Sequence, residues 1–386
     1  MFTLLKNADI YAPESLGLGH ILVCAGKIVA INKAVPQLGT GLEIQTLDLE
    51  GRVVLPGLID AHTHLTGGGG ETGYASRVPT VPLSDFTRAG VTSVVGLLGT
   101  DDIMRTSSSL IAATMALREQ GLSAWCYTGG YHFPLTLLTE SAVSDITHIE
   151  CVIGIGELAI SDHRSSHLTC EELIRVAGQA HVGGLMTGKA GVLHLHMGDG
   201  SAGLSLVNSA LDIGEVPART YNPTHVNRQA ALFDEACELT LRGCTIDLTA
   251  YPVKETDPDI SVVHAVQKFI DGGYPKDKLT VSSDGGGCLP TFDAQGRLTK
   301  LGFASSLSLV TTLGELLRAG LGVEEAAPFF NQNVAKLLRL HNKGELRVGA
   351  DADLLSLDSN HAVCDVMCRG ELHIREGVVI KKGLFE

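Results

Sequence analysis

The stretch Leu55-Pro56-Gly57-Leu58-Ile59-Asp60-Ala61-His62-Thr63-His64 is an apolar run that ends in two histidines spaced two residues apart. Side chains two positions apart in a β-strand point to the same side. We therefore expect His62 and His64 to direct both imidazoles at one point, as a divalent metal requires of two of its ligands. Histidine pairs are also common without a metal, so this interpretation depends on finding further ligands.

The composition indicates a large α/β protein. The chain has 386 residues, of which 44% are hydrophobic, and a mean hydropathy of +0.20, which is enough for a sizeable core. Abundant glycine (45 residues) and few aromatic residues (5%) suit many strand-to-helix turns better than a sandwich with an aromatic core. The net charge of −14 disfavours nucleic acid and anionic membranes as partners, because both require a basic surface.

The cysteines and the N-terminus indicate a cytoplasmic protein. The nine cysteines are odd in number, contain no Cys-x-x-Cys pair and lie mostly in apolar stretches, so we expect reduced, buried thiols. Residues 1–9 lack the basic and apolar regions of a signal peptide. No apolar run approaches the roughly 18 residues that would span a bilayer, so no membrane partner is expected.

The middle of the chain has the rhythm of a (β/α)₈ TIM-type barrel. Apolar, strand-like segments recur about every 20 to 40 residues, with amphipathic helical patterns between several of them. Eight segments are expected as strands: 54–65, 91–99, 123–131, 152–160, 191–197, 222–226, 244–250 and 279–284. Helices are expected over Leu309–Ala319 and Val323–Leu340. The alternative, an open doubly wound sheet, lacks its usual Gly-x-Gly-x-x-Gly after the first strand.

Both ends of the chain differ from this middle part. Residues 1–55 and 347–386 consist of short strand-like runs with turns. We expect the two ends to form one small β-sandwich domain, and residues 56–346 to form the barrel.

Polar residues occur where the expected barrel strands end. In TIM barrels the chemistry lies at the C-terminal ends of the strands. The side chains that arrive there are His62, His64, Glu157, His196, His225 and Asp284. Because polar groups at apolar strand ends cost free energy unless they are satisfied, their convergence predicts a metal site. Six ligands exceed the three that a catalytic zinc usually takes, which favours two ions about 3.5–4 Å apart.

The other histidines receive different interpretations. His194 lies two residues before His196 and one layer deeper, so we expect it to be a hydrogen-bonded core residue. His163, His167 and His181 fall in polar or helical contexts and are expected at the surface.

Residues 56–64 resemble the signature of the amidohydrolase superfamily, as does the tail from Lys343 to Leu354. Longer blocks are similar to the isoaspartyl (β-aspartyl) dipeptidases, and they follow in order along nearly the whole chain. These blocks are 64–71 with Gly-Gly-Gly-Gly-Glu, 90–101, 159–165 with Ser-Asp-His-Arg, 196–199, 223–228 and 282–285. The fold that this resemblance implies, a barrel with a β domain from both termini, agrees with the pattern described above.

The resemblance implies a binuclear zinc enzyme that hydrolyses β-aspartyl dipeptides and forms a homo-oligomer. His62, His64 and Asp284 would bind one ion, and His196 and His225 the second. A hydroxide between the ions would attack the peptide carbonyl, and Asp284 would take its proton and pass it to the leaving amine.

The same resemblance implies a set of substrate-binding residues. Glu71 would hold the α-ammonium group, Arg164 and Arg228 the carboxylates, Tyr131 the scissile carbonyl, and Thr100 would help to position the substrate. An isoaspartyl dipeptide carries one ammonium and two carboxylates, and one glutamate with two arginines matches that charge pattern.

Two positions depart from the family pattern. Glu157 stands where well-known members have a carboxylated lysine that bridges the metals, and we expect the glutamate to bridge without carboxylation. Cys288 stands where the substrate loop has a serine, and a thiol is the weaker hydrogen-bond donor. We do not expect Cys288 to be a nucleophile, because no base beyond the metal ligands is evident.

Several alternatives stay open at this stage. The chain could be another amide hydrolase of the superfamily, such as an N-acyl amino acid deacylase or a cyclic amidohydrolase. It could also be an inactive, assembly-forming relative or a binding protein for acidic dipeptides. Cobalt and manganese accept the same ligands as zinc, and the glycine run 67–70 is expected as a flap over the substrate, with a tight turn as the alternative.

Overall fold

A curved sheet of six parallel strands forms the centre of the molecule. The computed structural model describes residues 1–37, 39, 41–253, 259–292 and 298–386. The six strands pair in chain order: β6 (Leu58–Thr63), β7 (Val91–Gly96), β8 (Ser123–Thr128), β9 (Val152–Ile160), β10 (Val192–Met197) and β11 (Tyr221–Thr224). All nine residues of β9 are buried, as expected for a parallel strand covered on both faces.

Two further parallel strands, β12 (Ile246–Thr249) and β13 (Leu279–Ser282), pair with each other beside this sheet. Side chains connect the two sheets on one side, where Thr224 donates a hydrogen bond to Asp247 (2.7 Å). On the other side the backbone N–H of Ser283 donates to Asp60 on β6 (3.1 Å). The strands therefore form a TIM-like barrel, and each of the eight expected segments overlaps one of its strands.

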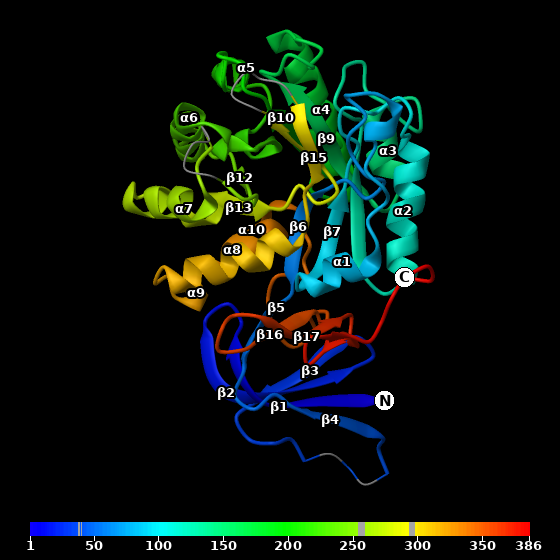
Figure 1. Cartoon of the computed structure of the whole chain (residues 1–386), viewed down its shortest axis with the longest axis vertical. Helices are drawn as coiled ribbons and strands as arrows, with labels where there is room; N and C mark the ends of the chain where they lie inside the picture. The colour runs from blue at the N-terminus through cyan, green and yellow to red at the C-terminus, as the bar shows by residue number, and fades with distance from the viewer. Residues whose placement is uncertain (38, 40, 254–258, 293–297) are drawn as a thin grey trace.

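Helices surround the outer face of these strands (Figure 1). They are α1 (Leu83–Arg88), α2 (Ser107–Glu119), α3 (Ala142–His148), α4 (Cys170–Thr187), α5 (Ser205–Ile213), α6 (Ala230–Leu241), α7 (Val262–Asp271) and α8 (Leu307–Arg318). Short 3₁₀ turns precede or connect them: η1 (Tyr74–Ser76), η2 (Ala218–Thr220), η3 (Val226–Arg228) and η4 (Lys276–Lys278). The longest helix, α4, begins with a capping box in which Thr169 and Glu172 satisfy each other's backbone N–H groups.

One helix prediction was wrong. The segment Val323–Leu340 is divided into α9 (Val323–Ala326), η5 (Ala327–Phe330) and α10 (Gln332–Leu337). Pro328 in the first turn of η5 lacks a backbone N–H and interrupts the helical hydrogen bonds. The Asn331 side chain then accepts from the N–H of Gln332 and starts a new helix.

A second, mainly antiparallel sheet lies beside the barrel, at the bottom of Figure 1. Its strands are β1 (Phe2–Tyr11), β2 (Ser15–Cys24), β3 (Lys27–Asn32), β4 (Ile44–Asp48), β5 (Val53–Pro56), β16 (Leu354–Leu357), β17 (Val363–Cys368), β18 (Glu371–Arg375) and β19 (Val378–Val379). We expected a sandwich, but these strands form one hydrogen-bonded sheet, because β5 pairs with both β1 and β16.

The first expected barrel segment, 54–65, is therefore shared between the two sheets. Gly57 separates β5 from β6, and a side chain there would collide with Thr92, since a Cβ would lie 2.1 Å from its hydroxyl. A hairpin of β14 (Cys288–Phe292) and β15 (Leu298–Phe303), which the pattern did not predict, follows β13. Among the described residues, no helix combines the length and apolar character needed to cross a membrane.

Candidate metal centre and substrate site

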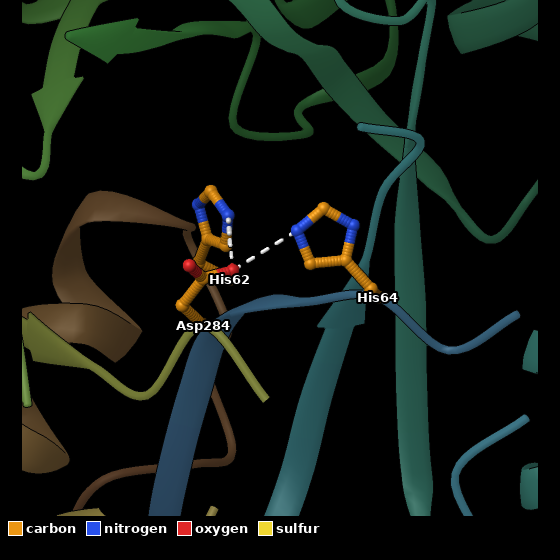
Figure 2. Close-up of side chains that lie close together, drawn as sticks. All are labelled: His62, His64 and Asp284. Carbon is orange, nitrogen blue, oxygen red and sulfur yellow. Dashed lines mark ion pairs between the residues drawn. The ribbon is translucent and has the colours of Figure 1, made fainter. Parts of the chain in front are cut away.

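His62, His64 and Asp284 meet at the ends of neighbouring strands. His62 lies on β6, His64 directly follows it, and Asp284 follows β13. The Asp284 carboxylate oxygen Oδ1 lies 3.0 Å from Nε2 of His64 and 3.5 Å from Nε2 of His62. Dashed lines in Figure 2 mark these two ion pairs. The expected convergence of both imidazoles on one point is therefore present in the structure.

Glu157 on β9 lies at the centre of the remaining ligands. Its Oε2 is 2.8 Å from Nδ1 of His196 and 3.6 Å from Nε2 of both His62 and His225. Its other oxygen, Oε1, lies 3.6 Å from Nε2 of His64. One carboxylate therefore contacts all four imidazoles, which is the position a bridging ligand would occupy.

Two of these residues have an unusual backbone. His225 and Asp284 adopt left-handed conformations, with φ of 59° and 56°. Such angles are uncommon for residues other than glycine and cluster at functional sites. The turn that follows each strand thus directs the side chain into the centre.

Burial and close contact perturb the pKa values of the cluster. Burial opposes the charge of Glu157, but His62 and His196 outweigh it and hold the pKa of this carboxyl well below its usual range. Burial would lower the pKa of His62, but Glu157 and Asp284 raise it to about 9. The carboxylates are therefore ionised, and without a metal ion a protonated His62 balances part of their charge.

The donor atoms fit a divalent metal. Two groups place one donor atom of each residue within 4.8 Å of the others: His62, His64 and Asp284, and His62, Glu157 and His225. Nε2 of His62 and Oδ1 of Asp284 are buried and lack a hydrogen-bond partner among the described residues. Buried polar atoms without a partner are costly, and a metal ion would satisfy both.

Three predicted substrate residues form a charged group at the mouth of the site. Arg164 Nη1 and the Thr100 hydroxyl both donate to the Glu71 Oε1 atom, each at 3.0 Å. The Glu71 and Arg164 side chains are partly exposed, at 28% and 31%. The anion and the cation expected to hold the two ends of a substrate's aspartyl group therefore lie together and reachable from solvent.

Asp162 is a residue of the site that the sequence analysis missed. Its carboxylate accepts hydrogen bonds from the Tyr131 hydroxyl (3.0 Å) and from Arg164 Nε and Nη2 (2.9 and 2.7 Å). It also lies 3.2 Å from Nε2 of His196. The Ser-Asp-His-Arg block was the available signal, but only its arginine was assigned a role.

The side chains of Tyr131 and Arg228 are hydrogen-bonded to protein groups beside the metal cluster. The Tyr131 ring is buried, contacts the His196 ring at a centroid distance of 4.7 Å, and directs its hydroxyl at Asp162. Arg228, in η3, donates to the backbone carbonyl of Met197 (3.0 Å) and lies 3.4 Å from Nε2 of His196. Both residues thus adjoin the metal cluster.

Cys288, which begins β14, is half-buried. Burial, together with Glu71 and Asp284, raises the pKa of its thiol. Because the thiolate is the nucleophilic form, this environment disfavours a nucleophilic role.

The glycine run 67–70 is a hydrogen-bonded turn. Gly68 donates to the carbonyl of Gly286 (2.8 Å) and accepts from Val78 (2.9 Å). A Cβ on Gly67 would lie 2.0 Å from the Val78 carbonyl oxygen, so only glycine fits this close approach. These contacts favour the tight turn over a flap.

The other histidines follow the expected pattern. His194 is fully buried and hydrogen-bonded to His62 and Asn222, which confirms its interpretation as a core residue. His163 and His167 are exposed, and His181 is partly exposed.

The barrel and its cluster of histidines and carboxylates define a metal-binding hydrolase of the amidohydrolase type. A family model described as the amidohydrolase family matches residues 45–98, which include His62 and His64. A crystal structure of β-aspartyl dipeptidase from Fervidobacterium islandicum AW-1, in complex with β-Asp-Leu, is 37% identical. It superimposes with a TM-score of 0.92 and covers 98% of this chain and 97% of its own. This chain therefore belongs to the β-aspartyl dipeptidase family.

Other similar proteins are more distant, and one solved structure among them shows the same fold. Dihydropyrimidinase from Brevibacillus agri NCHU1002 has a TM-score of 0.67 at 17% identity over 99% of this chain and 97% of its own. Imidazolonepropionase from Streptococcus gordonii is 36% identical over 90 residues, or 22% of this chain. The match to that curated relative covers only about a fifth (21%) of its length.

Proposed function

We propose that this protein is a peptidase that hydrolyses β-aspartyl dipeptides with the help of two divalent metal ions, and that both ions are zinc. The observation that carries this proposal is the pairing of the metal-ligand cluster with the Glu71–Arg164 group at its mouth. The family relative whose structure holds β-Asp-Leu supports the choice of substrate.

The metal ligands divide between two ions. His62, His64 and Asp284 would hold one ion, and His196 and His225 the other, with Glu157 between them. Bound ions of this kind activate water and polarise a carbonyl group.

The charged group at the mouth would recognise the aspartyl part of the substrate. Glu71 and Arg164 balance each other before substrate binds. A β-aspartyl dipeptide brings an ammonium for Glu71 and a carboxylate for Arg164, so it replaces one ion pair by two without leaving a charge unpaired. Thr100, which already donates to Glu71, would keep that carboxylate in place.

The remaining residues would act near the scissile bond. With Oδ1 of Asp284 bound to the metal, the other oxygen of this carboxylate would take a proton from the attacking water and return it to the leaving amine. Tyr131 would turn its hydroxyl from Asp162 to the scissile carbonyl, and Arg228 would bind the second carboxylate. Cys288 would contribute a weak hydrogen bond from the substrate loop.

We extend the proposal to the assembly and its location. The hydrogen bonds between β11 and β12 and between β6 and the residues after β13 fit a closed eight-stranded barrel. We also propose that residues 1–55 and 347–386 form one domain and 56–346 the other, and that the enzyme is a cytoplasmic homo-oligomer.

A comparison of two isomeric peptides tests the proposed function. The zinc-loaded protein should hydrolyse β-Asp-Leu and leave α-Asp-Leu intact. If protein that binds two ions cleaves neither peptide, the proposed substrate class is wrong. Hydrolysis of N-acetyl-aspartate or dihydrouracil in their place would instead favour a deacylase or a cyclic amidohydrolase.

A further inference from the structure

A chain of buried hydrogen bonds runs away from His62 on the side opposite its free nitrogen. His62 Nδ1 lies 2.8 Å from Nε2 of His194, and His194 Nδ1 lies 2.6 Å from Oδ1 of Asn222. Asn222 Nδ2 then donates to the backbone carbonyl of Thr245 at 2.8 Å. Both imidazoles are fully buried, and Asn222 is 1% exposed, so water does not compete for these bonds.

The donor and acceptor character of these groups fixes the direction of each hydrogen bond in the series. The carbonyl of Thr245 can only accept, so the Asn222 amide nitrogen must face it and the amide oxygen must face His194. An amide oxygen also only accepts, so His194 carries its proton on Nδ1. A neutral imidazole with that proton has an acceptor at Nε2, and His62 must therefore donate to it from Nδ1.

Nε2 is the other ring nitrogen of His62, and it faces the metal cluster. When His62 loses its second proton, the ring keeps the proton on Nδ1 that donates to His194, and so has its lone pair on Nε2. That atom faces Asp284 Oδ1 and Glu157 Oε2, at 3.5 and 3.6 Å, and has no hydrogen-bond partner among the described residues. This is the tautomer that a metal ligand requires.

We propose that His194 and Asn222 are positioning residues that hold His62 in the tautomer able to bind a metal through Nε2. This inference rests on the proposed role of His62 as a ligand. His194 would thus act on the metal site through another side chain, although it faces the barrel core and contacts no proposed substrate group.

Two neighbouring features support a fixed geometry for His194. Its ring stacks on Tyr127, with a centroid distance of 5.2 Å and an angle of 22° between the planes. On the next strand, a Cβ on Gly156 would lie 2.7 Å from the His194 Cβ, so only glycine lets the histidine lie this close. Two other proposed ligands, His196 and His225, also have a partner on the ring nitrogen that faces away from Glu157. Asp162 lies beside Nε2 of His196, and the Thr249 hydroxyl lies beside Nδ1 of His225.

Metal affinity is the first measurement. The metal-free protein would be titrated with zinc against a chromophoric chelator, for the parent, His194→Phe, His194→Gln and His373→Phe. The His194→Phe variant should bind the first ion about 10- to 100-fold more weakly, the usual cost of losing a partner behind a ligand. The His194→Gln variant should stay within about threefold of the parent, because its amide can accept from His62 and donate to Asn222.

His373→Phe is the matched control, since this buried histidine belongs to the second sheet. Equal losses in His194→Phe and His373→Phe, or parent-like affinity in His194→Phe, would overturn the inference. A loss in His194→Gln as large as in His194→Phe would also overturn it. A parent protein that binds no zinc would instead refute the proposed function itself.

The tautomers themselves are the second measurement, and it does not depend on bound metal. Solid-state ¹⁵N NMR of the histidine-labelled, metal-free protein, recorded above the His62 pKa of about 9 so that this ring is neutral, distinguishes a ring protonated on Nδ1 from one protonated on Nε2. Substitution Asn222→Leu should convert one buried Nδ1–H ring to a mixture of tautomers. An unchanged histidine spectrum in Asn222→Leu would contradict the inference, even if His194→Phe did not fold.

Discussion

Substitution Glu157→Ala tests the central feature of the proposed metal centre. The Glu157 side chain is 3% exposed and lies within 3.6 Å of a nitrogen of each of four histidines. Alanine removes a carboxylate that contacts all four. We expect the variant to lose the second ion and to hold the first only weakly, because its remaining ligands are His62, His64 and Asp284.

The size of the effect follows from the burial of the carboxylate. Removing one partner of a buried charge pair costs about 3–5 kcal/mol. At about 1.4 kcal/mol per factor of ten, affinity for the more weakly bound ion should fall about 10²- to 10⁴-fold. Glu157→Gln keeps the shape and one carbonyl oxygen but not the charge, and should lie between the parent and Glu157→Ala.

The assay counts the zinc ions that remain bound per chain after gel filtration. They are measured by mass spectrometry at micromolar protein concentration. The parent should retain two ions and Glu157→Ala at most one, and hydrolysis of β-Asp-Leu should fall with the second ion. Glu119→Ala, an exposed carboxylate on α2, serves as the control and should retain both. Two ions in Glu157→Ala would refute the bridging role.

Three further predictions concern residues around and away from the centre. Asp162→Asn should lower kcat/KM for β-Asp-Leu about 10- to 100-fold, because Tyr131, Arg164 and His196 lose a shared carboxylate; values within twofold of the parent would contradict this. Cys288→Ser should lower KM with kcat unchanged, because a hydroxyl is the better donor; loss of turnover would show that the thiol takes part in the chemistry. Burial lowers the pKa of His373 to about 4, so this ring is neutral in the fold and gains a proton on unfolding below pH 6.5. Stability should therefore fall as the pH drops from 6.5 to 5, by up to about 2 kcal/mol for this group, and urea unfolding of His373→Phe should lack that part of the fall.

The features that sequence predicted best are those set by short-range periodicity. Buried parallel strands leave continuous apolar runs, as in β9, and each of the eight expected segments overlaps a strand. The convergence of His62, Glu157 and Asp284 followed from strand ends alone, because parallel strands in a barrel present those ends at one rim. Helix boundaries were less predictable, since Pro328 and Asn331 interrupt a pattern whose apolar spacing continues.

What sequence did not predict is set by contacts across strands. The left-handed φ of His225 and Asp284 depends on how each turn leaves its strand, and the residues alone carry no signal for it. Likewise, the Glu71–Arg164 pair joins loops 93 positions apart, so their mutual neutralisation required the structure.

Asp162 received no role from the sequence, and His194 was predicted only as a hydrogen-bonded core residue; both cases have one physical cause. Each places an acceptor behind an imidazole: Asp162 behind His196, and His194 behind His62. A metal ligand is chosen in sequence by its residue type, but its partner can be a carboxylate, an imidazole, a hydroxyl or a backbone carbonyl, so no single residue type identifies it. If these partners act through separate ligands, their effects on metal affinity should add in the double variant of Asp162→Asn and His194→Phe. A coupling well above about 0.5 kcal/mol would instead mean that Glu157, which contacts both imidazoles, transmits one perturbation to the other.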